Sequence, residues 1–248
     1  MCKDDSRHDL TQPPFFRNAG QFCDAFFHAK WCYEWGLKED LCIHPGPGFC
    51  YRTVVYIVAH LQEEGKPVYV ARYKNCYRGH TESNLHAEEF LVADPRIQAV
   101  TQPALLTLWM TYQPCHCCSG SRYVDRHSKS CSRLLLDFVD KHPNLRLMIR
   151  CASLYRAHYT DPRGFASTKD AQVFRQRVAL AQEGINLLCK HPRIRMAGFR
   201  KADWDWLMTL LPNKCLNLTH VEWEHRKQVD MCVTRHLSRS ATTPPKPP

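Results

Sequence analysis

The segment Cys131–Tyr155, "CSRLLLDFVDKHPNLRLMIRCASLY", predicts a helix that runs directly into a strand. Apolar residues recur three, four, seven and eight positions after Cys131, which is the spacing of one helix face and turns the Cys131 sulfur inward. Pro143 ends the helix, and the residues after it alternate between apolar and other side chains, as in a strand covered on one face. The apolar helix face consists of Cys131, Leu134, Leu135, Phe138 and Val139.

The segments on both sides extend this alternation of helices and strands. Two β-rich runs joined by Gln62–Gly65 are typical of a hairpin. We expect Asn84 or Ser83 to cap the helix that follows, and Gly184 to end a later one. Strands are expected at 52–61, 66–73, 104–112 and 145–155, with one more within 185–200, and helices at 21–29, 84–94, 131–142, 170–184, 202–211 and 220–237. This order predicts an α/β domain whose sheet is covered by helices.

The formal charge of +10 is concentrated in one region of the chain. Residues 141–201 hold 13 Lys and Arg and three acids, so they carry the whole excess. A confined basic excess is typical of a surface that binds a polyanion, and equally of a solvated surface that aids solubility. No apolar run approaches the roughly 20 residues of a membrane span, so we expect no membrane partner.

The cysteine content and the N-terminus favour different compartments. Fourteen cysteines and one acceptor pattern for glycosylation at Asn217 are typical of a secreted chain. The polar start, Met1–Leu10, lacks the apolar core of a secretory signal and favours the cytoplasm or nucleus. Both interpretations stay open, because a removed leader ahead of Met1 would reconcile them. Several cysteines should pair in a secreted chain, whereas most should be buried in an intracellular one.

Two short motifs, His86-Ala87-Glu88 and Pro114-Cys115, carry the candidate chemistry. The first opens a predicted helix, and the second follows the next predicted strand. One imidazole and two thiolates would form a zinc site with an open fourth position, the form that catalytic zinc takes. Glu88 shares the first helical turn with His86, so it can carry protons between a zinc-activated water and a substrate. Each motif is common alone, but together on helix, strand and next helix they match the pattern of zinc nucleobase deaminases.

The chain resembles the AID/APOBEC polynucleotide cytidine deaminases over roughly Phe15–Leu211. The similarity is strongest in "HAEEFL" (His86–Leu91), in "TYQPC" (Thr111–Cys115) and in the segment quoted first. The resemblance implies a cytidine-deaminase-like α/β fold with a single five-stranded mixed sheet and about six helices. It also implies one catalytic zinc ion and the conversion of cytosine to uracil in single-stranded DNA or RNA.

The usual Pro-Cys-x-x-Cys motif of the family would make Cys115 and Cys118 ligands beside His86. The residues after Cys118 are polar and show no apolar stripe, whereas those after Cys131 resemble the post-ligand helix and strand of the family without a gap. We therefore expect His86, Cys115 and Cys131 to bind zinc, with residues 116–130 as an insertion at the active site. Cys118 remains the alternative to Cys131.

The insertion leaves His116, Cys117, Cys118 and His127 without an assigned role. These residues could form disulfides, hold a second metal ion or lie on the surface. We expect neither histidine to be a ligand.

The candidate substrate contacts lie around the same motifs. The family has Trp-Ser before the Pro-Cys pair, and Tyr112-Gln113 here keeps an aromatic pocket wall of different shape. Aromatic residues beside an arginine follow the strand where the family places its substrate-reading loop, and such residues commonly hold single strands. A core position suits Tyr155 equally well, and we expect Trp204 and Trp206 to be packing residues. The candidate substrate-binding residues are Tyr112, Tyr155, Arg156, Tyr159 and His44.

These features favour a zinc-dependent deaminase of single-stranded nucleic acid in which Glu88 is the catalytic acid and base. A deaminase of free cytidine or deoxycytidine would tend to be shorter and would lack the basic region. A catalytically inactive, zinc-containing nucleic-acid-binding protein is a third possibility, because an insertion beside the metal could block the pocket. We expect the deaminase domain to span 15–238, between a flexible arm at 1–14 and a disordered tail at 239–248.

Overall fold

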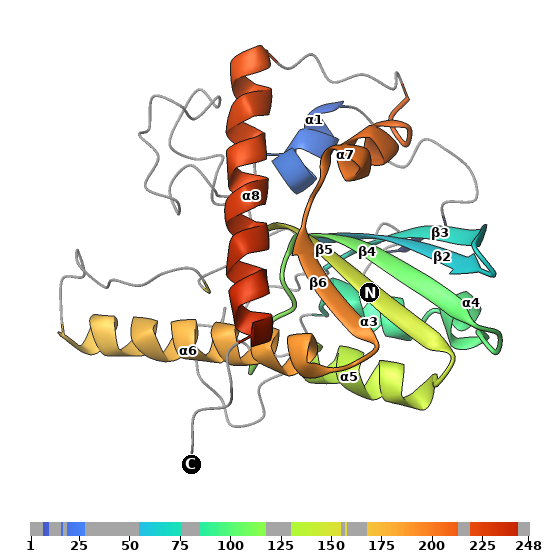
Figure 1. Cartoon of the computed structure of the whole chain (residues 1–248), viewed down its shortest axis with the longest axis horizontal. Helices are drawn as coiled ribbons and strands as arrows, with labels where there is room; N and C mark the ends of the chain where they lie inside the picture. The colour runs from blue at the N-terminus through green and yellow to red at the C-terminus, as the bar shows by residue number, and fades with distance from the viewer. Residues whose placement is uncertain are drawn as a thin grey trace.

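The computed structural model describes residues 7–9, 16, 19–27, 55–75, 85–117, 130–154, 157, 168–212 and 219–242. Within these residues one mixed sheet lies between two layers of helices (Figure 1). The strands are β1 (Arg7–Asp9), β2 (Tyr56–Glu63), β3 (Lys66–Lys74), β4 (Ala104–Tyr112), β5 (Leu145–Ser153) and β6 (Ile194–Gly198). The helices are α1 (Ala19–Phe22), the π-helical η1 (Cys23–Phe27), α3 (Ala87–Val92), α4 (Pro95–Gln98), α5 (Cys131–Lys141), α6 (Thr168–Lys190), α7 (Lys201–Met208) and α8 (His220–Thr242).

The expected α/β class and single mixed sheet are confirmed for the described residues. The five predicted strands are β2 to β6, and the short β1 pairs with β3 from within the range predicted to be a flexible arm. The described residues form seven α-helices instead of about six, because the short α4 follows α3 directly. At the other end, α8 continues to Thr242, into the range predicted to be a disordered tail.

The strand order is β1-β3-β2-β4-β5-β6. The hairpin of β2 and β3 is antiparallel, and β2 is antiparallel to β4. The strands β4, β5 and β6 are parallel, and the crossovers contain α5 and α6. Carboxyl ends of parallel strands meet at one edge of a sheet, so the residues that follow β4 emerge beside the end of β5. Tyr112 and Ser153 are paired there.

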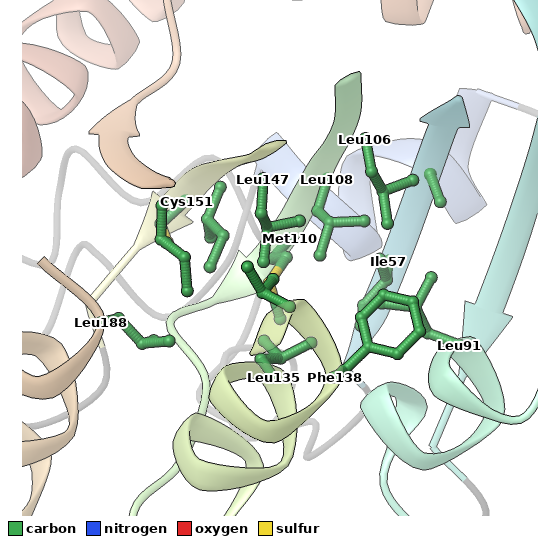
Figure 2. Packing of buried hydrophobic residues seen from close by; sticks show 14 of the residues in the cluster. Ile57, Leu91, Leu106, Leu108, Met110, Leu135, Phe138, Leu147, Cys151 and Leu188 are labelled. Atoms are coloured by element: carbon green, nitrogen blue, oxygen red, sulfur yellow. The ribbon is translucent and has the colours of Figure 1, made fainter. Parts of the chain in front are cut away.

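Each face of the sheet has its own hydrophobic core. Alternate residues of β2, β4 and β5 pack under α3, α5 and α6, as Figure 2 shows for Leu91, Leu135, Phe138 and Leu188 against the sheet. The opposite face carries aromatic residues that pack against α1, η1 and α7. This second core contains Phe16, Phe22, Phe26, Phe27, Tyr56, Trp109, Phe199 and Trp204, with Trp206 partly buried against it. Trp204 and Trp206 are thus packing residues, as predicted.

The helix α8 joins the two cores. Its later residues Val229, Val233 and Leu237 belong to the core under α3, α5 and α6, while its Trp223 packs against the aromatic core. The backbone of α8 can reach both cores because it approaches β6 closely at Gly198. A Cβ on Gly198 would lie 2.6 Å from the Asp230 carbonyl oxygen.

The start of α3 and the end of α6 also differ from the prediction. The helix α3 has His86 as its N-cap instead of Asn84 or Ser83, and the Glu89 carboxylate accepts a hydrogen bond from the His86 backbone N–H at 2.7 Å. The helix α6 does not end at Gly184 but continues to Lys190. Gly184 is buried, and a Cβ on it would lie 2.6 Å from the His116 Cβ. Its role is therefore close packing within the helix instead of termination.

Candidate metal centre

His86, Cys115 and Cys131 form a compact group. The imidazole comes from the N-cap of α3, the first thiol follows β4, and the second thiol opens α5. The His86 Nδ1 atom lies 3.4 Å from the Cys115 Sγ and 3.2 Å from the Cys131 Sγ. All candidate ligand atoms lie within 4.8 Å of one another, so this group could hold a metal ion. Cys118, the alternative to Cys131, lies outside the described residues.

The fold explains why these residues meet. The helices α3 and α5 pack side by side under the sheet (Figure 1), and His86 and Cys131 stand at their N-termini. The helix dipole favours negative charge at such positions, which suits thiolates. Cys115 reaches the same place because β4 ends at Tyr112 and the chain then turns toward α5, where the Ser132 N–H donates to the Cys115 carbonyl at 3.0 Å.

The surroundings of Cys131 favour its protonated form. Its side chain is 1% exposed. A hydrogen bond with Cys115 lowers its pKa, but burial and the neighbouring Glu88 carboxylate outweigh that bond and raise the pKa to about 12. A thiol with such a pKa becomes a thiolate when a cation compensates the buried charge. Metal binding and deprotonation of Cys131 are therefore coupled.

Glu88 lies beside the ligand group in the first turn of α3 and is 3% exposed. Burial raises the pKa of its carboxyl group, and interactions with His86 and Cys131 oppose that rise. A buried carboxyl with a raised pKa can exchange protons nearer to neutral pH than an exposed one. Such groups are concentrated at functional sites.

Of the candidate substrate contacts, Tyr112 is the one that the structure describes. It is the last residue of β4 and is 8% exposed. Strand alternation places it on the same face as Met110, which is the face covered by α3 and α5. His44, Tyr155, Arg156 and Tyr159 lie outside the described residues, as does His127 of the predicted insertion.

Basic residues stand at both ends of the sheet, and Arg200 and Lys201 of the region 141–201 follow the C-terminal end of β6. Arg146 and Arg195 stand at the N-terminal ends of β5 and β6, whereas Cys115 follows the C-terminal end of β4. Because these strands are parallel, the two arginines lie at the far end from the ligand group. Arg150 is buried and donates to a backbone carbonyl. Arg133, outside the basic region identified from sequence, is exposed on the first turn of α5 and lies at the ligand end.

Sequence reasoning gave His116 no role and allowed it a surface position, which is wrong because the residue is buried, and it did not single out Ser130 or Ser132 on either side of Cys131. His116 is 1% exposed, Ser132 is fully buried, and Ser130 is the N-cap of α5. The signal for Ser130 was local, since serine directly before an apolar helical stripe is typical of an N-cap. No local pattern marked His116, because its burial depends on α6, far along the chain.

No protein-family model matches this chain, and no curated protein matches it significantly. Every helix in the described part of the chain is too short or too polar to span a membrane.

Proposed function

We propose that this protein is a zinc-dependent deaminase that converts cytosine to uracil in single-stranded DNA or RNA, with a cytidine-deaminase-like fold related to the AID/APOBEC family. The observation that carries the proposal is the buried Glu88 carboxyl beside an imidazole that faces two thiols. A purely structural metal site has no use for a buried carboxylate that is not a ligand. The arrangement of His-x-Glu on one helix, with two cysteines after the next strand, matches the zinc nucleobase deaminases.

The ligand group is suited to zinc. Bond lengths of about 2.3 Å to sulfur and 2.05 Å to nitrogen in a tetrahedral site separate N and S by about 3.6 Å. The separations from His86 Nδ1 to the two sulfurs are 3.4 and 3.2 Å, close to that value. His86, Cys115 and Cys131 would therefore be the ligands. When bound, zinc would supply a nucleophile at neutral pH, because it lowers the pKa of water to about 7.

Glu88 would move the protons of the reaction. Its carboxylate would accept a proton from the attacking water, and the oxygen of that water forms the new bond to C4 of cytosine. The same carboxyl group would pass that proton to N3 of the pyrimidine. It would then carry the second proton of the water from the new C4 hydroxyl to the exocyclic nitrogen, which leaves as ammonia while a carbonyl remains. Burial favours the protonated form of Glu88 and so assists its return of a proton.

The chain would contact both the target base and the phosphate backbone of the substrate. Tyr112 stands three residues before Cys115 on the ligand face of the sheet and would form one wall for an extruded base. Tyr155, Arg156 and Tyr159 are the further contacts that the family resemblance proposes, and His44 is another candidate from the sequence. Arg133, exposed at the ligand end of α5, is suited to a backbone phosphate.

The decisive experiment compares purified wild-type protein with Glu88→Gln and Asp137→Asn. Asp137 is an exposed carboxylate on α5 and serves as the matched control. Each protein is incubated with a cytosine-containing single-stranded DNA, its RNA counterpart and free cytidine, and uracil or uridine formation is measured together with bound zinc. We expect wild type and Asp137→Asn to convert one of the polynucleotides, and Glu88→Gln to retain zinc while activity falls by about 10² to 10⁴-fold.

Other outcomes point to other functions. Conversion of free cytidine that oligonucleotides do not inhibit would indicate a nucleoside deaminase. A folded, zinc-loaded wild-type protein that converts none of the three substrates would contradict the proposal. It would favour a zinc-containing nucleic-acid-binding protein without catalysis.

A further inference from the structure

A hydrogen bond joins the residue after one candidate ligand to the residue before the other. His116 follows Cys115 and Ser130 precedes Cys131, and the His116 Nδ1 and Ser130 Oγ atoms lie 2.8 Å apart, 14 positions apart in sequence. The Ser130 Oγ also accepts from the Arg133 N–H at 3.2 Å, as the N-cap of α5. Its hydroxyl hydrogen is therefore available to His116 Nδ1.

Ser132 makes a second connection on the other side of Cys131. Its backbone N–H donates to the Cys115 carbonyl at 3.0 Å. Its hydroxyl lies 3.2 Å from the same carbonyl and 3.3 Å from the Pro114 carbonyl. Both neighbours of Cys131 are thus bonded to the short segment around Cys115. We call the contacts of His116, Ser130 and Ser132 the cysteine clasp.

The helix α6 packs against the residues of the clasp. His116 is 1% exposed, and its Nε2 atom faces the Glu183 carboxylate at 3.6 Å. A Cβ at Gly184 would lie 2.6 Å from the His116 Cβ and 2.7 Å from the Ser132 Oγ. No side chain larger than hydrogen fits at residue 184 while α6 and the clasp stay as they are, so His116 packs directly against this helix.

We propose that His116 is a positioning residue that holds Cys115 and Cys131 at metal-binding distance without being a ligand. In a Cys-x-x-Cys motif the short connection itself keeps two sulfurs together. Here Cys115 and Cys131 are 16 positions apart in the sequence, and a separation of that length does not by itself hold two sulfurs together. Groups that orient metal ligands typically contribute 10- to 100-fold to metal affinity. The inference rests on the metal centre of the proposed function, but not on the deamination reaction.

Three substitutions at His116 test the proposal by metal affinity. His116→Asn keeps a polar atom near the place of Nδ1, so it can still form a hydrogen bond with Ser130. His116→Gln reaches toward Glu183 instead, and His116→Ala keeps neither contact. Zinc affinity is measured by competition with a chelator, and the ligand geometry by the visible and charge-transfer absorption of the Co²⁺-loaded proteins. We expect the Ala and Gln variants to bind zinc about 10- to 100-fold more weakly, and Asn to restore most of the affinity.

Two controls separate positioning from packing. His225→Ala removes another buried histidine, on α8, and should leave the Co²⁺ spectrum unchanged whatever it does to thermal stability. Ser130→Thr retains the hydroxyl and should bind zinc normally, whereas Ser130→Ala should resemble His116→Ala. Equal zinc affinity in His116→Ala and wild type, with a lowered melting temperature of the metal-free protein alone, overturns the proposal. Equal behaviour of the Asn and Gln variants, or a wild-type protein that binds no zinc, overturns it too. None of these readouts depends on deaminase activity.

Discussion

The Sγ atom of Cys131 lies 3.2 Å from the Nδ1 atom of His86, although the two residues are 45 positions apart. The contact places the first residue of α5 against the residue that caps α3. It identifies Cys131 as a candidate ligand that a short Cys-x-x-Cys motif would not include. The ligand group therefore depends on the packing of two helix N-termini under the sheet.

Substitution of single cysteines should identify the ligands directly. Cys131→Ser should abolish stable zinc binding, because loss of a ligand exceeds the roughly 100-fold effect of a supporting residue. Cys117→Ser should retain about one zinc ion per chain, since Cys117 does not belong to the ligand group. The measurement is metal content after dialysis against a weak chelator. A Cys118→Ser variant that loses zinc while Cys131→Ser keeps it would contradict the assignment.

Local patterns were sufficient to predict most of the elements. The apolar stripe after Cys131 and the alternation after Pro143 predicted α5 and β5, because these patterns follow from burying one face of a helix or strand. Alternation fits the first half of β5, from Leu145 to Met148. The second half is buried on both sides, because α7 and α8 pack on its other face through Asp203 and Arg226.

Features that depend on distant contacts could not be predicted in this way. Gly184 resembled a helix stop, but its small size is needed against His116, which approaches from a different segment. The role of His116 itself depends on Ser130 and α6. The positions of the basic residues likewise follow from the parallel register of β5 and β6, which charge counting does not reveal.

Gly184→Ala should destabilise the protein although alanine is the better helix former. Alanine within a helix is normally favoured over glycine by about 1 kcal/mol. Here the new methyl group would lie 2.6 Å from the His116 Cβ, and such overpacking costs about 1–3 kcal/mol. The free energy of unfolding and the zinc affinity should both fall.

Ala179→Gly, at an exposed position of the same helix, is the control. It should lower the free energy of unfolding by about 1 kcal/mol and leave zinc affinity unchanged. A Gly184→Ala protein as stable as wild type would show that α6 can move away.

The buried ion pair of Arg226 and Asp230 should be essential for the docking of α8. The Arg226 Nη2 donates to the Asp230 Oδ1 at 2.7 Å and also to the Ala152 carbonyl, and the Trp204 Nε1 donates to the other carboxylate oxygen at 2.8 Å. Asp230→Asn leaves the fully buried guanidinium without its counter-charge, and such changes cost about 3–5 kcal/mol.

Asp205→Asn provides the matched control for that substitution. The Asp205 carboxylate pairs with Lys201 over the same four-residue spacing, but on the surface. An exposed pair contributes about 0–1 kcal/mol, so this variant should be nearly neutral. Urea unfolding of both variants measures the difference. Similar losses in the two proteins would mean that burial of the Arg226 pair does not determine its contribution.

Protonation of His60 should weaken the fold as the pH falls. Its ring stacks on the ring of Trp206, with the two centroids 5.2 Å apart. Burial lowers the pKa of His60 from the ordinary value of 6.5. The unfolded chain therefore binds a proton at a higher pH than the folded chain does. The contribution of His60 to stability is complete above about pH 6.5 and is lost as the pH falls through the lower folded-state pKa. A single histidine contributes a slope of at most about 1.4 kcal/mol per pH unit, and less here because the ring is only half-buried.

Urea unfolding between pH 7.5 and 5 should show a shallower loss of stability in His60→Gln than in wild type. His236→Gln should show a similar reduction, because burial also lowers the pKa of His236. An unchanged slope in His60→Gln would mean that the imidazolium remains solvated beside Trp206.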